Sequence, residues 1–347
     1  MGIELRPPPF VAADREIAAR RDQLFRETAL ETARRWALGF GYALRPHRVT
    51  GIPALSGMWL KEMVAPARSL PRAEQALARP AGLCGIVRDL SVPTLIEAHR
   101  RGLYPHAHIP PLKWWSPPER YVLFFDQFHM SKRLRSRLRQ ARHTVTFDRD
   151  FERVIKACAE PREGKWPVTW ITPAIMRAYA ALHDAGYAHS FEVWNTAGEL
   201  VGGGYGVAIG GAFTIESQFT RESHCSKIGF AALNWHLAHW GFHFSDNKGP
   251  TRNTIEMGFQ SVPRSEFIQM LADATNLPSR VGKWSVEADL KTVAAWEPNA
   301  GRSLDDPPQS APQKAPLLKR AHATSSLLVA EAVDGEILGW GVLAGIV

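Results

Sequence analysis

The chain has 347 residues, of which 45% are hydrophobic and 22% charged, a composition typical of globular domains rather than disordered chains. Its net charge of +8 fits a polyanionic partner such as RNA, although many proteins without one carry a similar charge. The cysteines Cys84, Cys158 and Cys225 form no CxxC pair and are odd in number, which argues against a disulfide framework and favours a reducing compartment. The first residues do not form a secretory signal, and no uncharged apolar run approaches the roughly 18 residues that span a bilayer, so we expect a cytoplasmic protein without membrane association.

The N-terminal part of the chain is expected to be helical. Residues 12–45 carry apolar side chains, including Trp36 and Leu38, among charged residues at helical spacing. The segment 45–53 breaks this pattern, and residues 64–82, rich in Ala, Pro and Arg, are typical of a linker. We therefore predict an N-terminal helical extension over residues 1–75.

From Gly82 onward, the apolar and polar residues follow the patterns typical of a globular domain. The segment 170–186 has the clearest helix limits, because Thr172 can cap it, Pro173 occupies the first helical position and Gly186 follows its end. Further helices are expected at 91–102, 130–143 and 147–160, and a strand at 120–125.

Three strand-like segments follow, at 190–195, 199–209 and 212–219, joined by short turns, which predicts an antiparallel meander. A buried helix at 226–241 and a short strand at 242–247 come next. Residues 297–317 are rich in Pro, Ser and Asp and are predicted to be flexible, whereas 318–347 are apolar enough to dock on another surface.

Several residues are candidates for chemistry. Glu216 lies within an otherwise apolar strand, where a carboxylate is either paired structurally or placed to bind a substrate amine or hydroxyl. The glycines at 202–204 permit close backbone approach but form no phosphate-binding loop. Adjacent His224 and Cys225 are a poor nucleophile pair, because neighbours in sequence rarely reach that geometry.

The loop around Trp114 and Trp115 is either a rigid aromatic anchor or a ligand-facing loop. His99, His106 and His108 have no standard zinc spacing, so we expect no metal there. The helix at 130–143 presents an arginine-rich face, which is either a footprint for a phosphate backbone or a solvated basic surface.

These segments together resemble the bacterial leucyl/phenylalanyl-tRNA–protein transferase family. The resemblance covers about 190 residues, from Gly82 to Leu271, and keeps the order of several motifs. The motifs are GLYPH, KWWSPPER, TWITPAIMRAYAALHDAGYAHSFEVWNTAGELVGGGYG, AFTIESQFTRESHCSK and a closing PRSEF.

The resemblance implies an α+β fold, with a small N-terminal α/β domain and an acetyltransferase-like (GNAT-type) domain that contains the antiparallel meander. The expected domains are the extension (1–75), the small domain (76–122), the catalytic domain (123–290) and a linker with a tail (291–347).

It also implies an aminoacyltransferase that moves leucine, phenylalanine or a related residue from aminoacyl-tRNA to the N-terminal amine of an acceptor protein with a basic first residue. The product would enter N-end-rule protein degradation. No cofactor or metal is implied, and we expect a monomer.

Site residues follow from the resemblance by position. Glu216, Asp246 and Lys248 correspond to the catalytic positions. The candidates for contact with the tRNA backbone come instead from the arginine-rich face of the helix at 130–143 and are Arg133, Arg135, Arg137 and Arg139. Substrate binding is assigned to Trp115, Trp170, Tyr179, Gly204, Phe213, Gln218, Ser226, Leu233 and Leu237.

The sequence departs from the family pattern at several of these positions. Gly204 and Gln218 replace pocket methionines, Lys248 replaces a neutral amide, and the family's Asn-Ala-Ser-Lys is His-Cys-Ser-Lys at 224–227. A buried amide requires a hydrogen-bond partner. A polar side chain on the transferred amino acid, called the cargo below, would supply that partner.

Two alternatives remain from the sequence. One is a divergent GNAT-like acyltransferase with another donor or a small-molecule amine acceptor, and the other is a catalytically silent homologue that binds RNA or a degradation signal.

Overall fold

The fold is α+β and is built on a seven-stranded sheet with the strand order β10-β4-β9-β8-β7-β6-β5. The computed structural model describes residues 9–67, 69–162, 164 and 166–298. Neighbouring strands are antiparallel except β8 and β9, which run parallel. The strands are β4 (Glu119–Phe124), β5 (Thr144–Phe147), β6 (Ala188–Trp194), β7 (Leu200–Ile209), β8 (Ala212–Thr220), β9 (Phe244–Asn247) and β10 (Gln260–Pro263).

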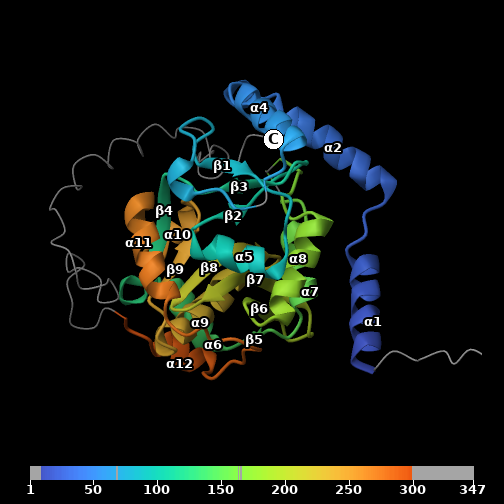
Figure 1. The fold of residues 1–347 in the computed structure, drawn as a ribbon. Coiled ribbons are helices and arrows are strands. Elements are labelled where there is room, and N and C mark those ends of the chain that lie inside the picture. Colours follow the sequence, from blue (N-terminus) through green and yellow to red (C-terminus); the bar gives the residue numbers. More distant parts are fainter. Residues whose placement is uncertain (1–8, 68, 163, 165, 299–347) are drawn as a thin grey trace, which may run out of the picture.

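Helices cover both faces of this sheet (Figure 1). Every residue of β6 and β7 is buried, as expected for strands with a layer on each side. One hydrophobic cluster joins the sheet to α6 (Lys132–Gln140), α9 (Cys225–His239) and α12 (Leu290–Ala295). A second cluster on the opposite face includes side chains of α5 (Val92–Arg100), α7 (Phe151–Ala159) and α8 (Pro173–Asp184).

The edge of the sheet at β10 and β4 is covered by α11 (Arg264–Thr275), whose Phe267 and Leu271 pack against Val122 and Phe244. Shorter helical turns connect these elements. They are η2 (Phe125–Gln127) and α10 (Arg252–Glu256).

A second, three-stranded sheet precedes β4. Its order is β1-β3-β2, formed by β1 (Leu83–Ile86), β2 (Tyr104–Pro105) and β3 (Lys113–Trp115). Both tryptophans of β3 are buried: the indole of Trp114 donates to the Val87 carbonyl at 2.9 Å, and that of Trp115 donates to the His106 carbonyl at 2.9 Å. The aromatic pair therefore anchors this loop, as one of the two sequence interpretations expected.

The N-terminal extension contains more helices than the sequence pattern predicted. The single helix expected over 12–45 is two helices. The first ends at Leu24, and the second begins after Thr28, whose side chain forms a capping box with Glu31. Of the other helical segments, 46–49 lies within the break expected at 45–53, 73–75 lies within the linker expected at 64–82, and 52–64 lies almost entirely between these two segments, where no element was predicted. The elements are α1 (Pro9–Leu24), α2 (Ala29–Ala43), α3 (Pro46–Val49), α4 (Ile52–Val64) and η1 (Ala73–Gln75).

The extension passes from the side of α7 and α8 to the small sheet, where α4 lies near β1 (Figure 1), and it is fastened by polar and aromatic contacts. Arg21 on α1 forms ion pairs with Glu152 on α7 and with Asp184 at the end of α8. On α2, the Leu38 carbonyl accepts a hydrogen bond from the Trp166 indole at 3.0 Å. The extension therefore packs against the second helical layer and the loops beside it.

The remaining helices and strands expected from the sequence after residue 90 are confirmed, with shifts of a few residues at their ends. The short strands β1, β2, β3, β5 and β10 and the helices α10 to α12 were not predicted, because their apolar runs are short. The flexible segment predicted at 297–317, apart from its first two residues, and the docking tail at 318–347 lie outside the described residues. Within the described part of the chain, no helix combines the length and apolar composition needed to cross a membrane.

Candidate active site

A β-bulge turns Glu216 into the protein interior. Tyr205 on β7 pairs with Ser217 on β8, whereas the next residue, Gly206, pairs with Ile215, so Glu216 is an additional residue on its strand. A bulge of this kind redirects the side chains on the bulged strand. Ile215 packs into the cluster beneath α9, and Glu216 points to the opposite face, toward α5.

The carboxylate of Glu216 has no exposed surface and contacts two partners. His99 on α5 has its Nε2 atom 3.0 Å from Oε1, and Lys248 has its Nζ atom 2.7 Å from Oε2. The other ring nitrogen of His99, Nδ1, lies 2.8 Å from the Leu95 carbonyl oxygen. Both ring nitrogens face acceptors, and only the imidazolium form donates to both.

Lys248 lies where the pairing of two parallel strands ends. β8 and β9 pair only over 212–214 and 244–246, and both Glu216 and Lys248 follow the last paired residue of their segment. The Nζ atom of Lys248 donates to the Ile215 carbonyl at 2.9 Å and lies 5.1 Å from the centre of the Tyr104 ring. The ammonium group therefore bridges the two strands at the point where their ladder stops.

Burial and charge act in opposition on this pair. Burial raises the pKa of Glu216, but the charge of Lys248 and the contact with His99 outweigh it and hold that pKa below its ordinary value. Burial lowers the pKa of Lys248, an effect that the charges of Glu216 and Asp246 oppose. The ion pair is therefore sensitive to any ligand that changes the local solvation.

Asp246 is held by a different cation. Arg120 on β4 forms a two-point ion pair with Asp246, with Nε 2.9 Å from Oδ1 and a second contact from Nη2 to Oδ2. Arg120 also donates to the Gly102 carbonyl at 2.9 Å. Both side chains are buried, so the Asp246 carboxylate acts on Lys248 through its charge while its oxygens bind Arg120.

Aromatic rings surround the ion pair on the α8 side. Trp170 stacks on His106 with ring centres 5.4 Å apart and lies edge-on to Tyr179 at 6.5 Å. Tyr179 in turn lies edge-on to Tyr205 at 5.5 Å. Burial, together with the nearby Glu216 charge, raises the pKa of both tyrosines, so they are neutral hydroxyl donors.

The loop that carries His106 is itself held from outside by the extension. Tyr42 on α2 lies edge-on to His108 at 4.8 Å, and the buried Arg48 donates to the Tyr42 hydroxyl at 2.7 Å. Lys113 donates to the Ile109 carbonyl at 3.2 Å from inside the loop. Burial lowers the pKa of Lys113 to about 7 and that of His108 to about 4.

The residues assigned to an amino-acid pocket lie on the other face of the sheet. Phe213, Leu233 and Leu237 are buried in the cluster between α9 and the sheet, whereas Tyr179 belongs to the cluster around α7 and α8. The structure thus brings Glu216, Lys248, Trp170 and Tyr179 together and separates them from these three apolar side chains. Ser226, on the first turn of α9, is half-buried, and Trp115 is buried in the small sheet.

Gly204 and Gln218, which replace two pocket methionines, are direct neighbours across β7 and β8. A Cβ atom added at Gly204 would lie 2.7 Å from the Gln218 Cγ atom and 2.8 Å from the Phe191 ring. The Ser217 carbonyl oxygen would also lie 2.7 Å from that Cβ atom, so the Gln218 side chain, the backbone of β8 and the Phe191 ring together leave no room for a side chain at position 204.

The basic helix α6 has two kinds of arginine. Leu134 and Leu138 are buried as predicted, and Arg133 and Arg139 are exposed. Arg135 instead donates to the carbonyl oxygens of Ala294 at 2.6 Å and Trp296 at 3.0 Å, where α12 ends. Arg137 is half-buried and lies near the start of α9.

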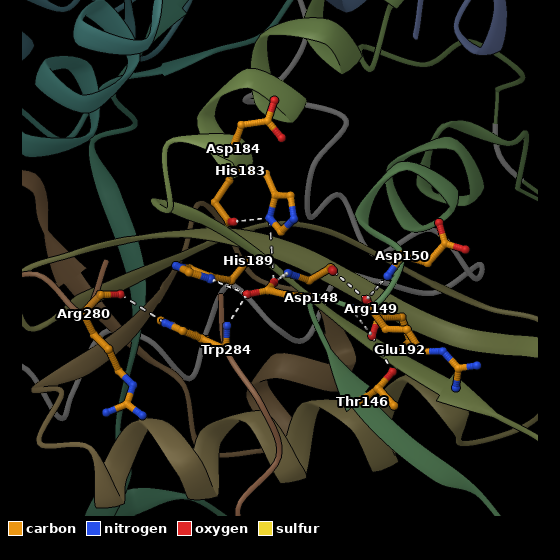
Figure 2. Close-up of polar contacts among 12 residues, drawn as sticks. Thr146, Asp148, Arg149, Asp150, His183, Asp184, His189, Glu192, Arg280 and Trp284 are labelled. Carbon is orange, nitrogen blue, oxygen red and sulfur yellow. Dashed lines mark hydrogen bonds and ion pairs between the residues drawn. The ribbon is translucent and has the colours of Figure 1, made fainter. Parts of the chain in front are cut away.

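A second buried polar cluster lies beside β6 (Figure 2). The Asp148 carboxylate accepts hydrogen bonds from His189 Nδ1 at 2.8 Å and from the backbone N–H groups of Ser190 at 2.8 Å and Trp284 at 2.7 Å. The His189 ring stacks on Trp284 with centres 3.6 Å apart. This cluster fastens the segment before α12 to the sheet and has a structural role.

Sequence reasoning missed several residues of the site. His99 was considered only as a metal ligand, and Arg120, Tyr104 and Tyr205 were not singled out. His99 is 117 residues from Glu216 and Arg120 is 126 residues from Asp246 along the chain. The local signal that could have indicated a buried ion pair was the position of Arg120 directly before the apolar residues 121–124, because a buried charge requires a partner of opposite charge.

Comparison with known proteins agrees with the arrangement of these segments. The profile described as "Leucyl/phenylalanyl-tRNA protein transferase" matches residues 122–272, and that of the N-terminal domain of the same transferase matches residues 88–118. A solved structure described as "The structure of L-PGS from Bacillus licheniformis" aligns with a TM-score of 0.25 at 12% identity, over 46% of this chain and 50% of its own, which carries no argument about the fold.

Curated relatives match at higher identity. The leucyl/phenylalanyl-tRNA–protein transferase of Azotobacter vinelandii is 47% identical over 212 residues, which cover 61% of this chain and 93% of the relative. The protein of the same description from Thiobacillus denitrificans is 41% identical over 230 residues, which cover 66% of this chain and 100% of the relative. The chain therefore belongs to the leucyl/phenylalanyl-tRNA–protein transferase family.

Proposed function

We propose that this protein is an aminoacyltransferase that moves leucine, phenylalanine or a related amino acid from aminoacyl-tRNA to the N-terminal amine of an acceptor protein. The observation that carries the proposal is the buried cluster of Glu216, Lys248 and His99 at the point where the β8–β9 ladder ends. Family membership supplies the reaction class, and the cluster supplies charged groups that can act on an ester and an amine.

The larger domain is proposed to be acetyltransferase-like. In support, β8 and β9 are parallel, are connected through α9 and pair over only three residues each. Parallel strands whose ladder ends early leave backbone N–H and C=O groups available to an acyl donor. The antiparallel strands β5 to β8 on one side of this point supply the rigid platform that such a site needs.

The aromatic group beside the ion pair is proposed to bind the 3′ end of the donor tRNA. Trp170 and His106 present a stacked pair, and Tyr179 lies against Trp170. Bases stack on aromatic side chains, and such stacking contributes about 1–3 kcal/mol per base. Trp170 is only partly buried, so part of its ring is accessible to a terminal adenine.

The reaction is aminolysis of an ester. The acceptor nitrogen attacks the ester carbonyl carbon, a C–N bond forms, the bond from carbon to the tRNA 3′ oxygen breaks, and a proton passes from the amine to that oxygen. We propose that Lys248 stabilises the negative charge that develops on the carbonyl oxygen and that Glu216, whose Oε2 lies 2.7 Å from Lys248 Nζ, holds the ammonium group in position. Because the ester is already activated, positioning supplies much of the rate.

The cargo pocket is proposed to differ from that of the relatives. Gln218 lies in the space opposite Gly204, where the family pattern has two methionines, so the pocket loses apolar volume and gains an amide. An amide favours a cargo side chain with a polar group, which extends the proposed range beyond leucine and phenylalanine.

The partners follow from the reaction. We expect aminoacyl-tRNA and an acceptor protein with a basic first residue, whose product is marked for degradation, and a monomeric enzyme in the cytoplasm. Lys248 disfavours a second cation nearby, so the basic side chain of the acceptor should bind away from it.

The experiment uses tRNA charged separately with each radiolabelled amino acid and an acceptor protein that begins with Arg. Label on the acceptor is the expected result, and it identifies the cargo. Glu216→Gln should lower kcat/KM roughly 100-fold while the tRNA affinity changes little, because the substitution removes the charge that positions Lys248.

The matched control is Glu192→Gln, which removes a buried carboxylate from β6 outside the candidate site. Glu192 accepts hydrogen bonds from Ser190 Oγ at 2.6 Å and Thr146 Oγ1 at 2.5 Å, and burial raises its pKa. Equal losses of activity in the two variants would show that Glu216 acts only through stability. Absence of transfer from every charged tRNA would contradict the proposed function.

A further inference from the structure

Four segments converge at one end of the large sheet. His143 comes directly before β5, Asn195 directly follows β6, Glu222 lies in the turn after β8, and Cys225 is the first residue of α9. Cys225 can approach β7 because Gly202 has no side chain: a Cβ atom there would lie 2.7 Å from the Cys225 Cβ. None of these residues takes part in the candidate active site.

Three of these side chains direct metal-binding atoms at one another. The Cys225 Sγ atom lies 3.4 Å from His143 Nε2, and that nitrogen lies 3.5 Å from Glu222 Oε2. All three atoms lie within 4.8 Å of one another. Ligand atoms on a tetrahedral zinc ion lie roughly 3.3–3.6 Å apart, given Zn–N and Zn–O bonds of about 2.0–2.1 Å and a Zn–S bond of about 2.3 Å.

We propose that Cys225, His143 and Glu222 bind a divalent cation that prefers sulfur ligands, with Zn²⁺ as the preferred ion. A water molecule would occupy the fourth coordination position. A thiolate, an imidazole and a carboxylate suit zinc better than the hard cations Mg²⁺ and Ca²⁺. Glu222 is half-exposed, so the group of ligand atoms borders solvent. A closed structural site would instead have four protein ligands.

The same atoms do not form a nucleophilic relay. In such a relay the nucleophile and the acid contact opposite nitrogens of the histidine, whereas here Cys225 and Glu222 both face Nε2. Burial also raises the pKa of Cys225 to about 11, so the free thiol is a weak nucleophile. A bound metal ion would displace the thiol proton, which couples binding to proton release.

The ligands are supported by a second set of contacts. Asn195 Nδ2 donates to Glu222 Oε1 at 3.1 Å, which leaves Oε2 for the metal. The Glu222 carbonyl accepts a hydrogen bond from the Cys225 N–H at 3.1 Å, and the Glu222 N–H donates to the Val201 carbonyl at 3.3 Å. The turn that carries two of the ligands is therefore held in place before a metal binds.

The electrostatic surroundings limit the affinity. Arg137 lies close enough to Cys225 to oppose the effect of burial on its pKa, and Arg133, Arg137 and Lys227 act on the neighbouring His224. Nearby cations favour the thiolate but repel a divalent ion, so we expect weaker binding than at zinc sites with four protein ligands. The family pattern described above has an alanine in place of Cys225.

The test is titration of the full chain with Co²⁺ and with Zn²⁺. One equivalent of Co²⁺ should give the near-ultraviolet charge-transfer band of a cobalt–thiolate bond, and Zn²⁺ should displace it. Cys225→Ala, which introduces the family residue, should abolish the band, and His143→Ala should weaken Co²⁺ binding at least about tenfold. Asn195→Ala should weaken it by about 10-fold, as expected for a residue that orients a ligand.

The matched controls are Cys84→Ala and Cys158→Ala, which remove the other two cysteines, both buried in other parts of the fold. They should retain the band at full intensity. The proposal is overturned if wild-type protein shows no thiolate band, if the band survives in Cys225→Ala, or if Cys84→Ala or Cys158→Ala abolishes it. Circular dichroism of each variant separates loss of ligand from loss of fold.

Discussion

The ion pair of Glu216 and Lys248 is buried on both sides, with exposed side-chain fractions of 0% and 2%. Removing two charges from water costs several kcal/mol each, and their attraction offsets that cost only when the remaining hydrogen-bonding positions are also satisfied. Here His99 and the Ile215 carbonyl supply those extra contacts. The pair is therefore a costly arrangement for the folded state, and this cost is compatible with the catalytic role proposed for it.

A double-mutant cycle tests this account. Lys248→Met leaves the Glu216 charge buried beside His99 alone and should lower the free energy of unfolding by about 3–5 kcal/mol. Adding Glu216→Gln to Lys248→Met should recover most of that loss, because the double variant buries no uncompensated charge. Urea unfolding measures each corner of the cycle.

The exposed pair of Arg101 and Glu97 on α5 is the comparison, because its side chains are 46% and 44% exposed. Glu97→Gln should change the free energy of unfolding by less than about 1 kcal/mol. A coupling energy between Glu216 and Lys248 below about 1 kcal/mol, the range of exposed pairs, would contradict the description of a desolvated ion pair.

At the scale of elements, α6 illustrates how one helix divides its charges between structure and solvent. Leu134 and Leu138 fix the buried face, and Arg135 satisfies two carbonyl groups at the end of α12. Cations near a helix C-terminus also interact favourably with the helix dipole. Arg133 and Arg139, by contrast, are exposed and available to a phosphate backbone.

The double variant Arg133→Ala/Arg139→Ala should therefore weaken tRNA binding for all tRNA sequences and reduce the slope of log affinity against log salt by roughly 1–2. Filter binding across a salt series measures both effects. Arg135→Ala should instead lower thermal stability, because it leaves the Ala294 and Trp296 carbonyls without this donor. An unchanged salt slope in the double variant would place the tRNA footprint on another surface.

At the scale of the whole molecule, the loop with His106 and His108 is where the parts of the structure meet. The small sheet carries the loop, α2 covers it through Tyr42, and Trp170 from the segment before α8 stacks on His106. Both histidines are buried, and burial lowers their pKa values, to about 4 for His108. The extension, which lies outside the matched profiles, therefore contributes to the surroundings of the candidate site.

Acidification should weaken this junction. The unfolded chain binds a proton at His108 near pH 6.5, whereas the folded chain binds one only near pH 4, so stability present above pH 6.5 is lost as the pH falls through that window. The loss attributable to His108 is at most about 3 kcal/mol. Chemical unfolding from pH 7 to pH 4 measures it.

His108→Gln removes the titrating group while keeping a polar side chain of similar reach, so its stability should depend less on pH between 4 and 6.5. If His108→Gln follows the wild-type pH curve, the acid sensitivity arises elsewhere.

Parts of the fold could be read from local patterns. The cap at Thr172 with Pro173 fixed the start of α8, and the alternating segments joined by glycine-containing turns predicted β6, β7 and β8. The break between α1 and α2 was missed because a capping box at Thr28 and Glu31 competes with a continuous helical pattern. Glu216 was recognisable as a carboxylate within an apolar strand, but its orientation depended on a bulge that the sequence does not display.

The sequence by itself determined many of the helices and strands, because periodicity is a local property of the chain, and its motifs determined the reaction class and the unusual residues through their resemblance to a known family. Only the tertiary structure decided that Lys248 pairs with Glu216, that Asp246 is bound by Arg120, and that the apolar pocket candidates lie on the other face of the sheet. The convergence of Cys225 and His143, which are 82 residues apart, belongs to the same category. Contacts between distant segments depend on strand register and helix packing, and a one-residue bulge is enough to change which side chains meet.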